Sequence, residues 1–392
     1  MIDFTFHSPT KIYFGHHAEE HLSEALKEFG FRRVILIYGG GSIKKNGLYQ
    51  KILNQLDGAS ISYQELSGIR ANPEVKDVIK GIAMVRSFQA DALLAVGGGS
   101  VIDTAKSIAV SCFYEGDPFD FNLHKAVPKR ALPIGVVLTI SSAGSELSDS
   151  CVISKDEIHI KQGFNYDIVR PVFAIENPEL TYSVPTYQKA AGISDIMMHS
   201  LERYHCASDE HQLADDFALD IVKSTMEAGL ACLKNPTDYE AHAAMMLNSS
   251  LSHNGLTNIG KPKSMVVHAL EHILSGYRPE ITHGAGVALL YPAWAEHVYH
   301  DDVAKFARLA RTLFEIKSAN DEEAAIIGIR SMKEFFRSIG MPASFQEVGI
   351  GKEDLPSLIA LATGNGTRTV GLYPRPLEKK DVEEIFSSLL VD

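Results

Sequence analysis

The 392-residue sequence lacks features that would assign it to several classes of protein. It has no excess of basic residues, because 49 Asp and Glu outnumber 37 Lys and Arg and give a net charge of −12. It therefore lacks the excess positive charge that is typical of nucleic-acid-binding proteins. No Lys/Arg cluster flanks an apolar segment, and no apolar run is long enough to span a bilayer. We expect neither a nucleic-acid partner nor membrane association.

Cysteine is scarce and scattered. None of the four shows Cys-x-x-Cys spacing: Cys112, Cys151, Cys206 and Cys232. Reduced structural thiols are therefore expected rather than a disulfide framework. The segment Met1–Phe6 has neither the charged start nor the apolar centre of a signal peptide. These features predict a cytoplasmic protein.

The first half of the chain alternates apolar runs with segments of helical period. Runs rich in β-branched residues suit strands buried on both faces, and they occupy residues 33–38, 92–96 and 134–138. Further strands are expected at 11–15, 61–66 and 172–175, and helices at 19–29, 48–56, 74–88 and 101–110. This alternation predicts a doubly wound α/β dinucleotide-binding domain over residues 1–184.

After Pro185 the pattern changes to helical segments separated by Pro and Gly. These segments are 187–206, 213–233, 239–256, 264–275, 288–298, 303–314, 322–339 and 377–390. They predict an all-α C-terminal domain over residues 185–392, which would carry a metal site.

A first glycine turn, Gly97, Gly98, Gly99 and Ser100, lies between an expected strand and an expected helix. Glycines let backbone N–H groups approach an anion, and the helix N-terminus adds favourable partial charge. Asp103 lies in the expected first helical turn, where its carboxylate interacts favourably with the helix dipole. The turn therefore suits a pyrophosphate, although a tight turn without a ligand explains it equally well.

A second glycine turn, Gly39, Gly40, Gly41 and Ser42, follows an earlier strand. Dinucleotide-binding folds commonly place an acidic residue there to hold the adenosine ribose. No Asp or Glu occurs between Tyr38 and Lys45, which leaves room for a 2′-phosphate near Lys44 and Lys45. These lysines are equally well explained as solvated helix residues.

Candidate metal ligands recur at helical spacing in the second half. Asp195 and His199 stand four residues apart, His268 and His272 repeat the spacing, and His283 follows a polar loop. On helices this spacing places each pair on one face. One carboxylate with two or three imidazoles suits a divalent first-row metal. The alternative for a single such pair is a helix cap beside a surface histidine.

With these pieces, the chain resembles the iron-containing alcohol dehydrogenase family, and it is most similar to the bacterial butanol dehydrogenase-like branch. The matching motifs span nearly the whole chain: residues 9–15, 38–47, 72–73, 97–106 and the set Asp195, His199, His268 and His283. The resemblance implies a metal between the two domains, held by those four residues, with His272 as a non-ligand near the nicotinamide. It also implies cofactor contacts at Asn72, Gly97–Ser100, Asp103, Thr139, Ser148, Lys161 and Leu180.

The implied reaction is reversible hydride transfer between NAD(P)H and a primary alcohol or aldehyde, with the metal acting as a Lewis acid on the substrate oxygen. His272 would relay the proton or serve as a hydrogen-bond partner of a ligand. The expected metal is Fe²⁺, with Zn²⁺ as the alternative. The expected cofactor is NADP(H), with NAD(H) as the alternative, and a homodimer is expected.

Rival functions remain open. A dehydroquinate-synthase-like or glycerol-dehydrogenase-like enzyme would use the same fold. The former handles a phosphorylated, carboxylated substrate and needs several basic residues near the metal, for which there are few candidates, such as Lys261, Lys263 and Arg278. A nucleotide-binding protein without turnover is the third alternative, and the intact four-ligand set argues against it.

Overall fold

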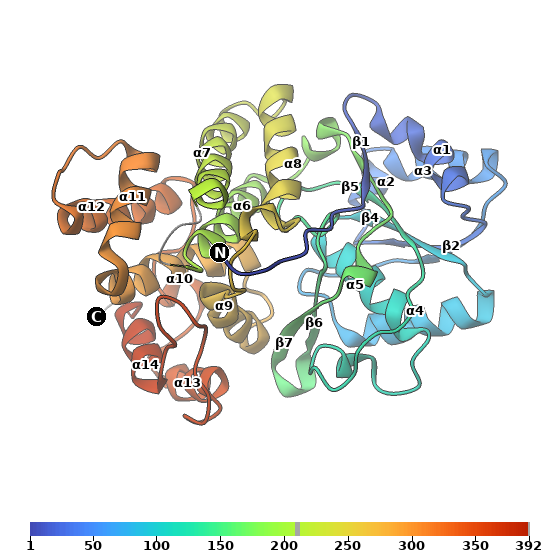
Figure 1. Cartoon of the computed structure of the whole chain (residues 1–392). Coiled ribbons are helices and arrows are strands. Elements are labelled where there is room, and N and C mark those ends of the chain that lie inside the picture. The colour runs from blue at the N-terminus through green and yellow to red at the C-terminus, as the bar shows by residue number, and fades with distance from the viewer. Residues whose placement is uncertain (208–211, 391–392) are drawn as a thin grey trace. The chain divides into compact units, whose positions relative to one another are not determined.

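The computed structural model describes residues 1–207 and 212–390. The chain divides into two compact units. The sheet unit comprises His7–Pro185 and Lys234–Asn254, and the helical unit comprises Met1–Phe6, Thr186–Leu233 and Gly255–Asp392. Figure 1 shows the elements of each unit, coloured along the chain.

The sheet unit is built on six strands that all run parallel. Their order is β1-β8-β5-β4-β2-β3. The strands are β1 (Lys11–Phe14), β2 (Arg33–Tyr38), β3 (Ser62–Leu66), β4 (Ala92–Gly97), β5 (Ile134–Leu138) and β8 (Phe173–Glu176). From β2 the chain first adds β3 on one side and then returns to add β4 on the other, so the strand order reverses between β2 and β4.

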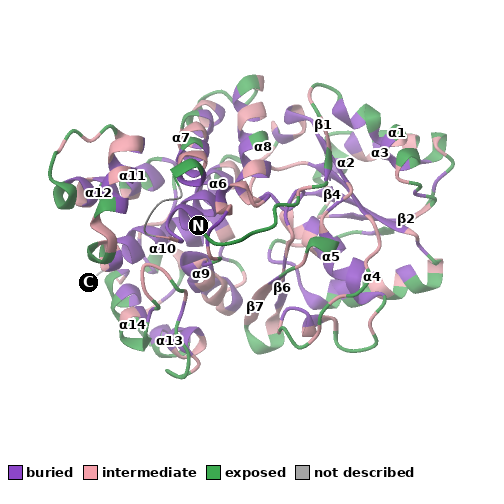
Figure 2. Cartoon of the chain, in the orientation of Figure 1, coloured by how far each residue is buried: buried purple, intermediate pink, exposed green. Residues whose placement is uncertain are grey.

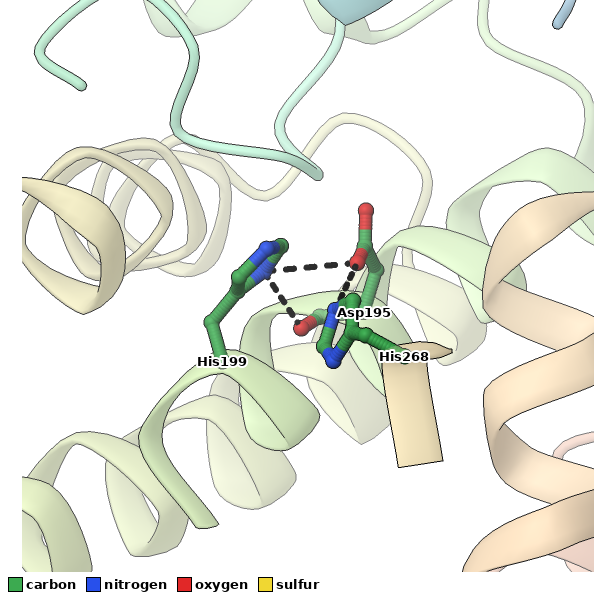
Figure 3. A group of neighbouring side chains, drawn as sticks. All are labelled: Asp195, His199 and His268. Atoms are coloured by element: carbon green, nitrogen blue, oxygen red, sulfur yellow. Dashed lines mark hydrogen bonds and ion pairs between the residues drawn. The ribbon is translucent and has the colours of Figure 1, made fainter. Parts of the chain in front are cut away.

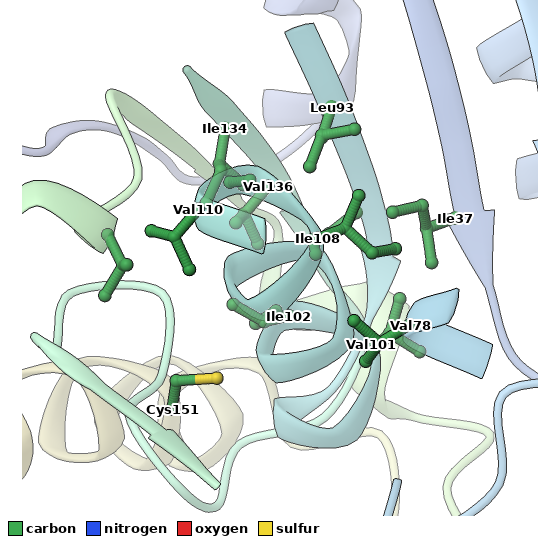
Figure 4. Packing of buried hydrophobic residues seen from close by; sticks show 14 of the residues in the cluster. Ile37, Val78, Leu93, Val101, Ile102, Ile108, Val110, Ile134, Val136 and Cys151 are labelled. Carbon is green, nitrogen blue, oxygen red and sulfur yellow. The ribbon is translucent and has the colours of Figure 1, made fainter. Parts of the chain in front are cut away.

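Helices cover both faces of this sheet. The main helices are α1 (Leu22–Glu28), α2 (Ser42–Lys45), α3 (Leu48–Gly58), α4 (Val75–Phe88), α5 (Gly99–Ser111) and α8 (Tyr239–His253). Alternate residues of β2 pack into different layers: Ile35 and Ile37 join the core under α4 and α5, whereas Val34 and Leu36 join the core under α1 and α3. Figure 4 shows residues of the first of these cores. Because both faces are buried, these strands have continuous apolar runs.

A hairpin outside the main sheet was not expected from the sequence. Strands β6 (Ser150–Lys155) and β7 (Ile160–Asn165) pair antiparallel and form their own two-stranded sheet. Their short runs mix Ser, Lys and Gly with a few apolar residues, so neither shows the apolar pattern of the main strands.

The helical unit contains a succession of packed helices. They are α6 (Thr186–Tyr204), α7 (Gln212–Lys234), α9 (Val266–Tyr277), α10 (His283–Val298), α11 (Val303–Phe314), α12 (Asp321–Ser338), α13 (Leu355–Thr363) and α14 (Lys379–Ser388). Helix α6 is buried from Ala190 to Tyr204, as its colour in Figure 2 shows. Helix α10 packs against α6, α9, α12 and α14, so these helices enclose a common core.

The predicted fold class is confirmed: a parallel α/β sheet precedes a mostly helical C-terminal part. Helix α13 was not expected, because its nearly continuous apolar run lacks the alternation of an amphipathic helix. Helix α8 groups with the sheet unit although it lies after residue 185. The boundary between residues 184 and 185 stays a prediction about how the chain divides functionally.

No helix within residues 1–207 and 212–390 has the length and apolar character needed to cross a membrane.

Candidate active site

Four predicted metal ligands converge within the helical unit. Asp195 and His199 come from α6, His268 from α9, and His283 is the first residue of α10. Asp195 Oδ1 lies 3.3 Å from His199 Nδ1, 3.7 Å from His268 Nε2 and 3.6 Å from His283 Nε2. In Figure 3, dashed lines connect Asp195 to the imidazoles of both His199 and His268. The spacing in the sequence therefore corresponds to one cluster in space.

Each of the three imidazoles directs its Nδ1 at an acceptor. His199 Nδ1 donates to the main-chain oxygen of Asp195 at 2.9 Å. His268 Nδ1 contacts Glu202 Oε2, and His283 Nδ1 contacts Glu271 Oε2. A nitrogen that donates carries the hydrogen, so Nε2 of each ring keeps its lone pair for a metal.

The sequence analysis missed these two glutamates. Glu202 lies three residues after His199 on α6, and Glu271 lies three residues after His268 on α9, so both stand at helical spacing from a ligand. That spacing was the available signal. Which imidazole each glutamate contacts could not be read from it, because Glu202 contacts His268 of another helix and Glu271 contacts His283 of another helix.

Two glycines let α10 approach the other ligand helices. A Cβ at Gly284 would collide with the Ala191 carbonyl group of α6. A Cβ at Gly286 would lie 2.7 Å from Glu271 Cγ of α9, closer than real Cβ contacts allow. The glycines that follow His283 therefore bring its imidazole to the cluster, because no other residue leaves this space.

The groups of the cluster shift one another's pKa values. Burial opposes ionisation of Asp195, but the neighbouring imidazoles outweigh burial and hold the pKa of Asp195 below its usual range. Burial opposes protonation of His268, but Glu202 and Asp195 outweigh it and raise the pKa of His268 to about 9. The cluster thus favours ionised carboxylates beside positive charge.

These residues fit a divalent first-row metal. Among the described residues, the buried Nε2 of His268 has no hydrogen-bond partner. Its nearest ionic neighbour, Asp195 Oδ1, lies beyond hydrogen-bond distance. A buried polar atom without a partner is costly unless a ligand satisfies it. One carboxylate and three imidazoles are also the donor types that iron and zinc accept.

His272 stands apart from Asp195. It lies one turn after His268 on α9, is half-buried, and its ring centroid is 5.6 Å from that of His283. Its donor atoms group with those of Glu271 and His283, within 4.8 Å of one another, whereas Asp195, His199 and His268 form a separate group. This position suits its predicted role as a non-ligand neighbour.

The predicted cofactor turns lie at one edge of the sheet unit. Residues Gly39–Ser42 follow β2, and Gly97–Ser100 end β4 and begin α5. Because β2 and β4 are parallel neighbours, both turns follow the carboxyl ends of strands at the point where the strand order reverses. Doubly wound folds bind nucleotides at this point.

The two turns differ in why they need glycine. A Cβ at Gly97 would lie 2.6 Å from Val101 Cγ2, and a Cβ at Gly98 would collide with Ile140, so packing alone requires both glycines. Gly40 is exposed, and a Cβ there would meet nothing within 4 Å. Packing therefore does not explain the glycine at position 40, whereas it explains those at 97 and 98.

Lys44 was predicted to pair with a phosphate or to be solvated. Its Nζ lies 5.2 Å from the Tyr38 ring centroid and 4.6 Å from the Tyr49 ring centroid. Glu65 of β3 accepts hydrogen bonds from the hydroxyls of both tyrosines, at 2.6 and 2.9 Å. Lys44 is thus an exposed cation resting on two rings, with the Glu65 carboxylate beside those rings.

The remaining predicted cofactor residues have mixed environments. Asp103 accepts from Ser145 Oγ at 2.6 Å and from the Val152 N–H at 2.9 Å, so its carboxylate fixes the loop that follows β5. Ser148 is fully buried and lies 3.2 Å from Lys106 Nζ. The others are Asn72 before α4, Thr139 directly after β5, Lys161 in β7, and Leu180 in the 3₁₀ helix η5 (Pro178–Thr181).

Known proteins match the chain along its full length. The model for the iron-containing alcohol dehydrogenase matches residues 9–178, and the model for the C-terminal part of the Fe-containing alcohol dehydrogenase family matches residues 189–390. The NADH-dependent butanol dehydrogenase A of Clostridium acetobutylicum is 39% identical over 98% of this chain and 99% of its own. The NADPH-dependent aldehyde reductase of Escherichia coli is 32% identical over 95% of each chain.

The crystal structure of NADH-dependent butanol dehydrogenase A from Thermotoga maritima has a TM-score of 0.95 and 32% identity, and the match covers 100% of this chain and 99% of that one. With both halves matched in this way, the chain belongs to the iron-containing alcohol dehydrogenase family.

Proposed function

We propose that this enzyme transfers a hydride reversibly between NAD(P)H and a primary alcohol or aldehyde. The observation that carries the proposal is the cluster around Asp195 Oδ1, in which two histidine Nε2 atoms approach within 3.7 Å and their Nδ1 atoms are held by glutamates. A structural salt-bridge cluster has no need for imidazoles whose Nε2 atoms converge on one oxygen.

Asp195, His199, His268 and His283 would hold the metal, with Fe²⁺ expected and Zn²⁺ as the alternative. When bound, the metal supplies Lewis-acid polarisation of the substrate oxygen. The protein residues provide the fixed donor set, because Glu202 and Glu271 prevent rotation of two of the three imidazoles.

His272 would move the proton. Oxidation of an alcohol removes a hydride from carbon and a proton from oxygen, and the nicotinamide takes only the hydride. An imidazole nitrogen of His272 can accept that proton, because the ring is half-buried and its centroid lies 5.6 Å from that of the proposed ligand His283. In the reverse direction the same nitrogen returns the proton to the reduced oxygen.

The cofactor would bind at Gly39–Ser42 and Gly97–Ser100, the turns at the reversal of strand order. The further contacts are proposed at Asn72, Asp103, Thr139, Ser148, Lys161 and Leu180. NADP(H) is the proposed preference, because Gly39–Ser42 contains no carboxylate and Lys44 carries a positive charge next to it. Glu65 moderates this charge, and the named relatives include both NADH- and NADPH-dependent enzymes. NAD(H) is therefore the alternative.

The proposed substrates are small primary alcohols and their aldehydes, with butanol and butanal as representatives. The names of the similar butanol dehydrogenases and aldehyde reductase support this class. The proposed setting is a cytoplasmic homodimer, with residues 1–184 binding the cofactor and residues 185–392 binding metal and substrate.

Two of the three candidate basic residues for a dehydroquinate-synthase-like reaction are engaged elsewhere in the protein. Lys261 is buried, and its Nζ donates to Asp215 and to the Arg203 carbonyl oxygen at 3.0 Å. Arg278 lies 3.7 Å from Asp354. Both cations are thus engaged by carboxylates of the protein itself, which weakens their attraction for a substrate phosphate.

A coupled experiment tests the proposal. The protein is purified anaerobically, its metal is measured by mass spectrometry, and NADPH and NADH oxidation is followed with butanal. The expected result is one metal per chain and metal-dependent turnover. Stoichiometric metal without turnover of any primary aldehyde would refute the proposed reaction, and absence of bound metal would refute the proposed site.

A further inference from the structure

The two glutamates of the cluster contact different parts of the structure. Glu202 accepts from the main-chain N–H groups of Val267 at 2.6 Å and His268 at 3.0 Å, in addition to contacting His268 Nδ1. These N–H groups belong to the first turn of α9, where intrahelical acceptors are absent and a carboxylate is favoured. Glu202 therefore fixes the start of the helix as well as the imidazole.

Glu271 holds an imidazole that is otherwise less constrained. Its side chain is fully buried in α9, and its Oε2 contacts Nδ1 of His283. The His283 side chain is 23% exposed, compared with 4% for His199 and 7% for His268. His283 is also the first residue of its helix. Neighbouring side chains therefore enclose its ring less than they enclose the rings of His199 and His268.

The room for this contact is built into the backbone. Because a Cβ at Gly286 would lie 2.7 Å from Glu271 Cγ, any larger residue there would displace the glutamate from His283. The first turn of α10 thus carries both the proposed ligand His283 and Gly286, which leaves space for the Glu271 side chain that contacts His283.

We propose that Glu271 is a positioning residue that sets how long the metal is retained, by holding the His283 ring with Nε2 toward Asp195. This inference rests on the proposed metal site and goes beyond it by assigning separate roles to the glutamates. Glu202 stabilises α9 whether or not metal is bound, whereas Glu271 acts on metal retention through its contact with His283.

Two substitutions separate charge from geometry at position 271. In Glu271→Gln the amide oxygen still accepts from His283 Nδ1, but the negative charge is lost. In Glu271→Ala both are lost and the ring is free to turn. Outer partners of metal-bound histidines typically contribute about 10- to 100-fold in metal affinity. Metal loss is therefore expected to be fastest in the alanine variant and intermediate in the glutamine variant.

Glu202→Gln and Glu296→Gln are the comparison variants. Glu296 is exposed on α10, the helix of His283, so its substitution controls for a lost charge on that element. Glu202→Gln should lower the melting temperature of the metal-free protein, because the first turn of α9 loses its carboxylate. Glu271→Gln and Glu296→Gln should leave that melting temperature within error of wild type.

The experiment uses the full-length protein loaded with Zn²⁺ or Co²⁺. Zn²⁺ loss to excess chelator is followed over time, and the Co²⁺ absorption bands report the ligand environment. The expected result is loss roughly 10- to 100-fold faster for Glu271→Ala, with altered Co²⁺ bands, and wild-type behaviour for Glu296→Gln.

Wild-type rates and unchanged Co²⁺ bands in both position-271 variants would overturn the inference while leaving the metal site intact. A lowered melting temperature of metal-free Glu271→Gln, without faster metal loss, would also overturn it, because the residue would then be structural. A wild-type protein that binds no stoichiometric metal would instead overturn the proposed function, and the inference with it.

Discussion

Each unit contains a cluster of buried carboxyl groups, and the two clusters neutralise their charge in opposite ways. In the helical unit, Asp195, Glu202 and Glu271 each face an imidazole. In the sheet unit, Glu146 and Glu176 face one hydroxyl, because Ser250 Oγ lies 2.7 Å from Glu146 Oε1 and 2.9 Å from Glu176 Oε1. A hydroxyl has a single hydrogen to donate, so the second of these contacts requires a proton on a carboxyl group.

The difference shows in the pKa values. Burial raises the pKa of Glu146 and Glu176, and the nearness of Glu146 raises that of Glu176 further. The imidazoles around Asp195 lower its pKa despite its burial. A buried carboxyl group therefore attracts a cation where imidazoles keep it ionised, and it keeps its proton where burial and a neighbouring carboxyl group dominate.

The largest expected effect follows from removing the charge at the centre of the cluster. Asp195→Asn preserves the shape of the side chain but leaves the three imidazoles without their common carboxylate. We expect metal content to fall below stoichiometry and kcat to fall by more than about 100-fold, beyond the effect typical of outer partners. His268→Ala should behave in the same way. Mass spectrometry of bound metal and steady-state kinetics measure both effects.

Asp149→Asn, a substitution in the sheet unit, serves as the matched control for the Asn exchange, because its carboxylate pairs with Arg170 outside the cluster. It should keep its metal. Full turnover by metal-depleted His268→Ala protein would contradict the metal site altogether.

The second prediction separates the proton carrier from the ligands. His272→Ala should retain stoichiometric metal, because the proposed ligands Asp195, His199, His268 and His283 all remain. General acid–base catalysis typically contributes about 10²- to 10⁴-fold, so kcat should fall by roughly 10²-fold or more. Loss of metal in this variant would instead identify His272 as a ligand. Pre-steady-state kinetics with a deuterated alcohol show whether the chemical step is affected.

The third prediction adds a carboxylate to the sheet unit, at the turn after β2. Gly39→Asp should reverse the proposed preference for NADPH, because a carboxylate accepts from the ribose hydroxyls and repels a 2′-phosphate. A Cβ at this position would lie 3.3 Å from the Ile69 carbonyl oxygen, so the side chain needs only a small adjustment. A charge-assisted hydrogen bond contributes about 1.5–3 kcal/mol, and its low end corresponds to about 10-fold in kcat/KM.

Gly39→Asn has nearly the same size without the charge, and it should change the preference much less. Equal kcat/KM values for NADH and NADPH in wild type, unchanged in Gly39→Asp, would show that the turn after β2 does not distinguish a ribose 2′-hydroxyl from a 2′-phosphate.

The smallest effect concerns stability and pH. The unfolded chain releases the Glu176 proton near the ordinary carboxyl pKa of 4.5, whereas the folded protein keeps it to higher pH. Folding therefore binds a proton in the window that starts at 4.5, and this carboxyl lowers stability progressively as pH rises through that window. Glu176→Gln removes the titration, so its melting temperature should exceed that of wild type increasingly from pH 5 upward.

Glu240→Gln, an exposed substitution on α8, should follow wild type at every pH. A melting temperature of Glu176→Gln that stays parallel to wild type across this range would show that the pair does not share a proton.

The sequence by itself determined the strands of the main sheet, most of the long helices and the residue types of the site. The runs at 33–38 and 134–138 became β2 and β5 with the expected bounds, because a strand buried on both faces leaves a continuous apolar signal. The helical spacing of Asp195 and His199 likewise placed both on one face of α6, because local periodicity fixes which side chains share a face.

Only the tertiary structure decided which groups meet across elements. The contacts of Glu202 with His268 and of Glu271 with His283 join different helices, and the glycines that permit the approach of α10 act on neighbours distant in sequence. The sharing of Ser250 by Glu146 and Glu176 brings together three residues far apart in the chain. Periodicity carries information over one or two turns of chain, whereas protonation and metal-ligand orientation depend on the packing of separate elements.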